Sequence, residues 1–167
     1  STLTTSWSLE LAKVTPNDFV IDLGSGDGRT PITAAKKFGA RAMGIEYNPD
    51  MVEFSNRAAA KEGVSAKVKF VKADLFETDF SQATVITMYL LPALNVKLRP
   101  KILDLKPGTR IVSHAFDMGE WQPDRTETHE GKTAYLWIVP AKVEGTWQLV
   151  QGELLLAQNF QTLIGTL

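Results

Sequence analysis

The most informative part of the sequence is the stretch Asp22-Leu23-Gly24-Ser25-Gly26-Asp27-Gly28-Arg29. It follows the short apolar run 19–23, which has the pattern of a buried parallel strand, and it precedes a helical pattern over 30–38. Glycines between a strand and a helix allow a tight turn and let a ligand approach the backbone closely. We therefore expect a ligand-binding loop here. The alternative is a turn with a purely structural role.

Strand and helix patterns alternate along most of the chain. The expected strands are 19–23, 41–46, 67–71, 83–88 and 109–115, and the expected helices are 3–14, 30–38, 49–62 and 93–105. Asn48 caps the third of these helices, and Pro100 is expected to kink or split the fourth. This alternation predicts an α/β fold, a Rossmann-like doubly wound sheet with helices on both faces. Ligands of such sheets bind beyond the carboxyl ends of the strands.

The alternation stops after the fifth strand. A terminal hairpin is expected from 124–129 and 133–140, and further β segments are expected at 146–150, 153–159 and 162–167. The sequence thus predicts a ligand-binding domain at 1–140 and a β-rich C-terminal extension at 141–167. The chain ends inside its last β segment, so we expect this extension to be truncated.

The spacing of the glycines distinguishes between two classes of cofactor. It is Gly-x-Gly-x-Gly, whereas the dinucleotide fingerprint is Gly-x-Gly-x-x-Gly, and Arg29 stands where that fingerprint needs its third glycine. Asp22 at the strand end would repel a pyrophosphate but could pair with a cationic amino group. S-adenosylmethionine (SAM) carries an α-ammonium, a carboxylate and a sulfonium, and it has no phosphate. The loop therefore favours SAM over a nicotinamide dinucleotide.

Two further acids follow expected strands. Glu46 ends the second strand, close to the roughly 20-residue spacing after the loop that suits an acid accepting from both ribose hydroxyls. Tyr47 beside it could pack on the adenine. Asp74 follows the third strand, where it could accept from the adenine amine, and the alternative is that Asp74 caps a helix before Glu77.

The three motifs resemble the successive SAM-binding motifs of seven-strand (class I) methyltransferases. They are Asp22–Arg29, Gly44–Tyr47 and Ala73–Phe76, and the resemblance covers roughly residues 9–140. More narrowly, Thr87–Pro92 and Ile111–Phe116 resemble bacterial relatives of the ATP synthase c-subunit lysine methyltransferase. A fainter similarity connects the chain with non-SET histone lysine methyltransferases.

The resemblance implies a SAM-binding methyltransferase domain that releases S-adenosylhomocysteine (SAH) and methylates an amine, most simply a protein lysine. It implies that the cofactor-binding residues are Asp22, Gly24, Ser25, Gly26, Gly28, Glu46, Tyr47, Asp74, Leu75 and Met88. Tyr89 would lie just beyond the fourth strand, near the sulfonium methyl. An amine must lose a proton before it is methylated, so Tyr89, His114 and Asp117 are the candidate catalytic residues. Alternatively, Tyr89 forms only a wall of the pocket, and His114 has only a structural role.

Composition excludes several other classes of protein. The formal net charge is −1, so no broad basic field attracts nucleic acid, and we expect a protein or small-molecule acceptor. The absence of cysteine excludes thiolate nucleophiles and cysteine-bound metals, and with only two histidines we expect no metal site. We expect no transmembrane segment and a cytoplasmic protein, or else an exported one whose leader has been removed.

Three alternatives to a lysine methyltransferase remain at this point. The first is a methyltransferase acting on a small molecule, with 116–124 shaping its pocket. The second is a non-catalytic module that binds SAM or SAH. The third is a nicotinamide dehydrogenase, which the glycine spacing disfavours.

Overall fold

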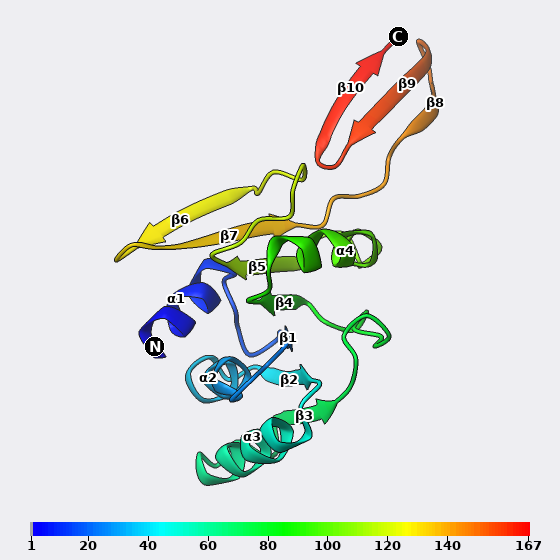
Figure 1. The fold of residues 1–167 in the computed structure, drawn as a ribbon. Coiled ribbons are helices and arrows are strands. Elements are labelled where there is room, and N and C mark those ends of the chain that lie inside the picture. Colours follow the sequence, from blue (N-terminus) through cyan, green and yellow to red (C-terminus); the bar gives the residue numbers. More distant parts are fainter. Residues whose placement is uncertain (1) are drawn as a thin grey trace.

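A seven-stranded sheet forms the centre of the molecule (Figure 1). The computed structural model describes the backbone of residues 2–167 and the side chains from Thr4 onward. The strand order is β3-β2-β1-β4-β5-β7-β6, in which the first five strands are parallel and β7 and β6 are antiparallel to their neighbours. The strands are β1 (Phe19–Leu23), β2 (Arg41–Glu46), β3 (Val68–Lys72), β4 (Val85–Met88), β5 (Arg110–His114), β6 (Arg125–His129) and β7 (Lys132–Ile138). The predicted doubly wound sheet and its terminal hairpin are confirmed.

Four helices accompany the sheet in the described part of the chain. They are α1 (Thr2–Leu11), α2 (Arg29–Phe38), α3 (Pro49–Lys61) and α4 (Pro92–Leu103). The Asn48 side chain caps α3 as predicted, because its oxygen accepts from the backbone amides of Asp50 and Met51. The prediction that Pro100 could split the fourth helix is wrong, since α4 continues through it.

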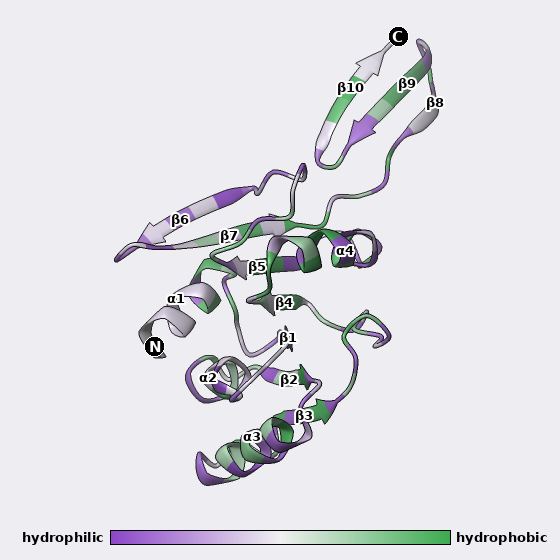
Figure 2. Cartoon of the chain, viewed as in Figure 1, coloured by the Kyte–Doolittle hydropathy of each residue, from purple (hydrophilic) through white to green (hydrophobic). Residues whose placement is uncertain are grey.

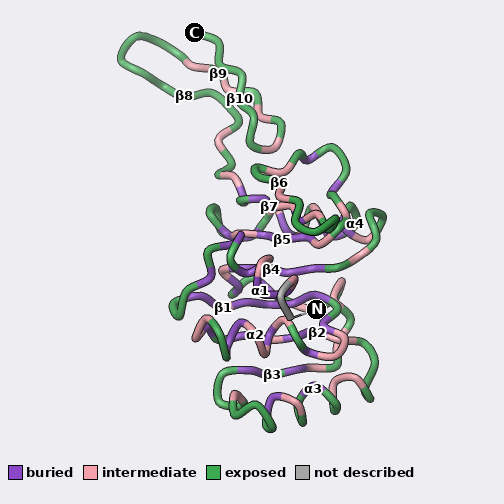
Figure 3. The backbone as a smooth tube through the Cα atoms, turned by 90° about the vertical axis from the view of Figure 1, so that its left-hand side faces the viewer, coloured by how far each residue is buried: buried purple, intermediate pink, exposed green. Residues whose placement is uncertain are grey.

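The core has two layers, one on each face of the sheet. The central strands between them are largely buried (Figure 3). Successive strand residues face opposite layers, so Val20 packs with α1, α2 and α3 while Ile21 packs with α4. The buried strands read as continuous apolar runs because both of their faces are covered. By contrast, β6 at the sheet edge is largely hydrophilic and exposed (Figure 2), which protects the edge from pairing with another chain.

The strand order reverses between β1 and β4. From β1 the chain moves outward through β2 and β3, and it then returns to β4 and continues to β5 in the other direction. The loops that leave β1 and β4 therefore diverge, and a crevice opens at the carboxyl ends of these two strands. The cofactor loop predicted from the sequence lies at this point.

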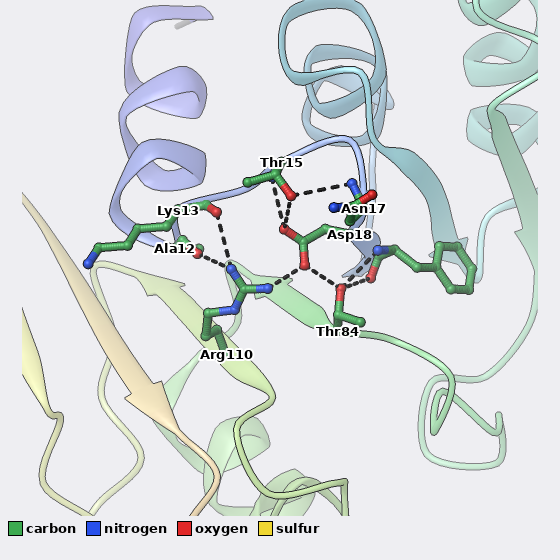
Figure 4. A network of polar contacts seen from close by, with 8 residues as sticks. Ala12, Lys13, Thr15, Asn17, Asp18, Thr84 and Arg110 are labelled. Carbon is green, nitrogen blue, oxygen red and sulfur yellow. Dashed lines mark hydrogen bonds and ion pairs between the residues drawn. The ribbon is translucent and has the colours of Figure 1, made fainter.

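A polar network anchors the opposite ends of the strands (Figure 4). The Arg110 guanidinium forms an ion pair with Asp18 and donates to the carbonyl of Ala12 at 2.6 Å, which ties β5 to the end of α1. Thr84 donates to Asp18 at 2.7 Å. Burial would raise the pKa of Asp18, but hydrogen bonds from Thr84 and the Thr15 amide, together with Arg110, lower it. The network fixes α1 and thereby one wall of the site described below.

The C-terminal residues form a separate three-stranded antiparallel sheet. Its strands are β8 (Gly145–Leu149), β9 (Gly152–Asn159) and β10 (Thr162–Thr166), in the order β10-β9-β8. The turn between β9 and β10 docks on the main body, where Phe160 stacks on Trp121 with ring centroids 5.9 Å apart. Most residues of this sheet are exposed or half-buried (Figure 3), and β9 and β10 carry exposed Leu and Ile side chains (Figure 2). The predicted extra β segments are thus confirmed as a sheet of their own.

Candidate functional site

The glycine loop joins β1 to α2 through left-handed backbone conformations. At Gly28 (φ +85°) an added Cβ would lie 2.7 Å from the Phe70 ring and 2.8 Å from Ser55, so this glycine lets the loop pack against β3 and α3. At Gly26 (φ +55°) an added Cβ would meet nothing within 4 Å. The two glycines therefore have different roles, since Gly28 permits internal packing and Gly26 leaves space in front of the loop.

That space is a cavity of about 410 Å³ at the crevice between β1 and β4. The predicted site residues that line it are Asp22, Gly24, Ser25, Gly26, Met88, Tyr89 and His114. The Ser25 side chain packs against Gly44, where an added Cβ would lie 2.5 Å from its hydroxyl oxygen. The close packing directs that hydroxyl toward β2, so the backbone of Ser25 is its main contribution to the cavity wall.

Asp22 is a buried acid in the cavity wall. The Thr87 hydroxyl donates to its Oδ1 at 2.8 Å. Burial raises the pKa of Asp22 to about 7, helped by the negative charges of Asp27 and Glu46, while the Thr87 hydrogen bond opposes the rise. A buried carboxyl group that is difficult to ionise alone is suited to receive a cation, such as the α-ammonium of SAM. The chemistry of the cavity fits this cofactor.

Glu46 lies behind the glycine loop and does not line the cavity itself. Its Oε1 accepts from the amide of Gly26 at 2.9 Å, and its Oε2 accepts from the amide of Asn48 at 2.8 Å. An ionised carboxylate has about four acceptor positions, so about two remain available for hydroxyl groups. Glu46 thus both fixes the loop and keeps the capacity to bind a ribose.

The other predicted adenosine contacts form an open shelf at the ends of β2 and β3. The amide of Ala73 donates to the carbonyl of Glu46 at 3.0 Å, which brings the two strand ends together. Tyr47 is 74% exposed, and Leu75 is half-buried. Asp74 accepts from the Phe76 amide at 2.9 Å and closes a turn, so the helix cap considered as its alternative role is wrong.

Two ring side chains, Tyr89 and His114, line the cavity beyond β4 and at the end of β5. The rings of Tyr89 and His114 stack with centroids 4.7 Å apart, and Phe116 meets Tyr89 edge-on at 5.9 Å. Burial lowers the pKa of His114, and the positive charge of Lys132 lowers it further. Both effects favour the neutral form of the imidazole.

The structure does not bring every predicted residue to the cavity. Asp117 is exposed, and its carboxylate accepts from the Gly119 amide at 3.2 Å within its own loop, so it does not line the cavity as expected of a proton acceptor. Conversely, the sequence analysis missed residues of α1, β4 and β7 that do line it: Thr4, Thr5, Ser8, Thr87 and Lys132. The helical spacing of the first segment predicted α1 itself, but no signal in the sequence indicated that α1 lines the cavity.

Comparisons with known proteins agree with this geometry. The family model for the ANTKMT methyltransferase domain matches residues 22–125. A protein-lysine N-methyltransferase of Saccharolobus islandicus is 44% identical over 137 residues, covering 78% of this chain and 85% of that protein. The lysine N-methyltransferase of the ATP synthase c-subunit from Homo sapiens is 38% identical over 113 residues, covering 67% of this chain and 48% of that protein. The chain thus spans about half the length of that human relative.

A solved structure is also similar. The RNA methyltransferase from Salinibacter ruber, in complex with SAH, is 51% identical with a TM-score of 0.83, covering 84% of this chain and 93% of that one. The match of the family model includes the glycine loop, Glu46, Asp74 and the Tyr89–His114 pair. The chain therefore belongs to the ANTKMT methyltransferase domain family and is a SAM-dependent methyltransferase.

Proposed function

We propose that this protein transfers the methyl group of SAM to the side-chain amine of a protein lysine. The observation that carries the proposal is the stacked Tyr89–His114 pair, whose rings line the same cavity as the glycine loop. The 44% identity to a protein-lysine N-methyltransferase supports it. SAM supplies an electrophilic methyl group when bound, and the chain supplies position and a route for the proton of the amine.

Deprotonation of the acceptor is the chemical problem that the site must solve. The unperturbed pKa of a lysine is near 10.4, so only roughly one in two thousand is neutral at pH 7. The rings that line the cavity lower this barrier, because removing the ammonium from water favours its neutral form. His114, which is half-buried and lines the same cavity, would accept the proton.

We propose that the cofactor lies along the carboxyl ends of β1, β2 and β4. Asp22 receives the ammonium, Gly26 leaves room for the methionine portion, and Glu46 accepts from the ribose hydroxyls. Tyr47, Asp74 and Leu75 would hold the adenine, and Met88, which lines the cavity, would contact the cofactor. Gly24, Ser25 and Gly28 shape the loop.

Replacing Glu46 with Ala should weaken SAM binding by about 1.5–3 kcal/mol, the range for hydrogen bonds to charged groups. The substitution also removes the acceptor that holds the Gly26 amide, so the loss should lie toward the upper end. Calorimetric titration with SAM and SAH measures it. Equal affinity in the variant would mean that Glu46 neither binds the cofactor nor holds the loop in the conformation that binds it.

Tyr89→Phe should keep SAM affinity but reduce turnover by up to about tenfold, which corresponds to one hydrogen bond of about 1.4 kcal/mol. Tyr89→Ala should reduce turnover further, because it also removes the ring that stacks on His114. Methyl incorporation into lysate proteins, read after digestion as mono-, di- and trimethyl-lysine, is the measurement. Unchanged turnover in Tyr89→Phe would show that the hydroxyl takes no part. Label confined to small molecules, carboxylates or hydroxyls would contradict the lysine proposal.

An RNA acceptor is the second candidate, because the Salinibacter ruber relative is described as an RNA methyltransferase. The charge of the chain disfavours it. The formal net charge is −1, and between residues 117 and 132 the acids outnumber the bases: Asp117, Glu120, Asp124, Glu127 and Glu130 against Arg125 and Lys132. A chain without a broad basic field has little attraction for a phosphate backbone.

A further inference from the structure

We propose that Lys132 of this chain is itself a methyl acceptor, modified by the cavity of its own molecule. The inference rests on the proposed lysine specificity and adds an acceptor that is built into the fold. Lys132 lines the same cavity as Asp22, Gly26 and Tyr89.

Strand pairing holds Lys132 at the reactive edge of the sheet. It follows the tight turn at Glu130 and Gly131, and it is the first residue of β7. The amide of Ala115 donates to the carbonyl of Thr133 at 2.8 Å, just after the carboxyl end of β5. This pairing places Lys132 beyond that strand end, on the side of the sheet where parallel strands present their ligands.

The amine of Lys132 is held only weakly. Its Nζ donates to the Thr4 hydroxyl at 3.4 Å, which is long for a hydrogen bond. The nearby acids have other partners, since Glu127 accepts from Trp7 at 3.1 Å and pairs with Arg125 at 2.7 Å, and Glu130 lies 3.8 Å from His129. Within the described part of the chain, Lys132 thus has no ion pair that would keep its amine charged and immobile.

Lys132 lies in the same surroundings as the proposed proton acceptor. It lies close enough to His114 for its charge to lower the pKa of that imidazole. A lysine beside an imidazole and an aromatic ring has the surroundings that we propose for the acceptor amine.

The reaction is a balanced methyl transfer. The Lys132 ammonium gives one proton to His114 or to water, and its nitrogen lone pair forms a bond to the methyl carbon of SAM. The sulfur–methyl bond breaks and its electrons remain on sulfur, which leaves SAH and N-methyl-lysine. Because the amine is tethered, its effective concentration does not depend on that of the protein, and the reaction is first order.

The experiment incubates the purified full chain with SAM and maps methylated peptides by mass spectrometry over a wide dilution series. Lys132 should gain methyl groups with a rate constant that dilution does not change. Lys106 is the matched control, because it is an exposed lysine in the turn before β5, at the opposite end of that strand. Lys132→Arg should lose the self-label, and Lys106→Arg should retain it.

A second measurement does not depend on turnover. The chain is treated with an amine-acylating reagent, with and without SAH, and the labelled lysines are quantified. SAH should suppress acylation at Lys132 and leave Lys106 unchanged, because only the former amine shares the cofactor cavity.

The outcomes separate this inference from the proposed function. Methylated lysines on acceptor proteins, with Lys132 unmodified and not protected by SAH, would overturn the inference and leave the function standing. If the rate constant for Lys132 methylation rose with protein concentration, one molecule would be modifying another, which would contradict modification by its own cavity. Label that reaches no lysine at all would overturn both.

Discussion

Asp22→Asn should stabilise the protein without ligand and, at the same time, weaken SAM binding severely. Burial raises the pKa of Asp22 to about 7, so the folded state holds a proton there that the unfolded state has lost above pH 4. The native protein should therefore lose up to about 1.4 kcal/mol of stability per pH unit as the pH rises from about 4 to 7. Asn keeps an oxygen for Thr87 and carries no charge, so this loss should vanish in the variant.

Although Asp22→Asn should stabilise the protein without ligand, it should weaken the binding of SAM. An ammonium facing Asn would be a buried charge without its partner, which costs about 3–5 kcal/mol. In the native protein SAM affinity should fall as the pH drops below 7, because Asp22 becomes protonated, and the variant should lack this dependence. Thermal unfolding and calorimetry at pH 5, 6, 7 and 8 test both effects. A variant that is less stable at pH 8 and binds SAM as tightly as before would make Asp22 a structural acid.

Gly26→Val should abolish SAM binding while the fold is retained. The branched side chain would fill the space in front of the loop, where the structure has no atom within 4 Å of an added Cβ. The left-handed backbone (φ +55°) adds a strain of about 1–2 kcal/mol. Calorimetric titration with SAM and thermal unfolding are the two measurements.

Gly63→Val is the matched control for this strain. Gly63 follows α3, has φ +73°, and also has open space around an added Cβ, but it does not line the cavity. Both variants should lose similar stability, and only Gly26→Val should lose SAM. Binding that survives in Gly26→Val would place the cofactor elsewhere.

The bounds of strands and helices that depend on neighbouring residues were predicted well from the sequence. The apolar runs of β1 and β2 gave their observed bounds, and Asn48-Pro49 fixed the start of α3, because strand burial and helix capping depend on neighbouring residues. The position of the glycine loop was predicted correctly because an apolar run precedes it and a helical pattern follows it. The roles of the predicted cofactor residues stay predictions, which the variants above test.

Features set by distant residues could not be predicted. Arg110 and Asp18 are 92 positions apart, and only the pairing of β5 beside β4 brings them together. Lys132 enters the cavity because β7 runs antiparallel to β5, and Thr4 enters because α1 packs on α2. Asp117 was expected to be a candidate proton acceptor, but its carboxylate accepts from the Gly119 amide within its own loop. Sequence periodicity contains no signal for these tertiary contacts.

The most direct test of the central claim is where the methyl group goes. The purified protein is incubated with methyl-tritiated SAM and a lysate, and the product is divided and treated with protease or with ribonuclease. We expect the label to be released by protease, to resist ribonuclease and to be recovered as methyl-lysine. Label that is released by ribonuclease and resists protease would contradict the proposed lysine acceptor and would show that the methyl acceptor is RNA.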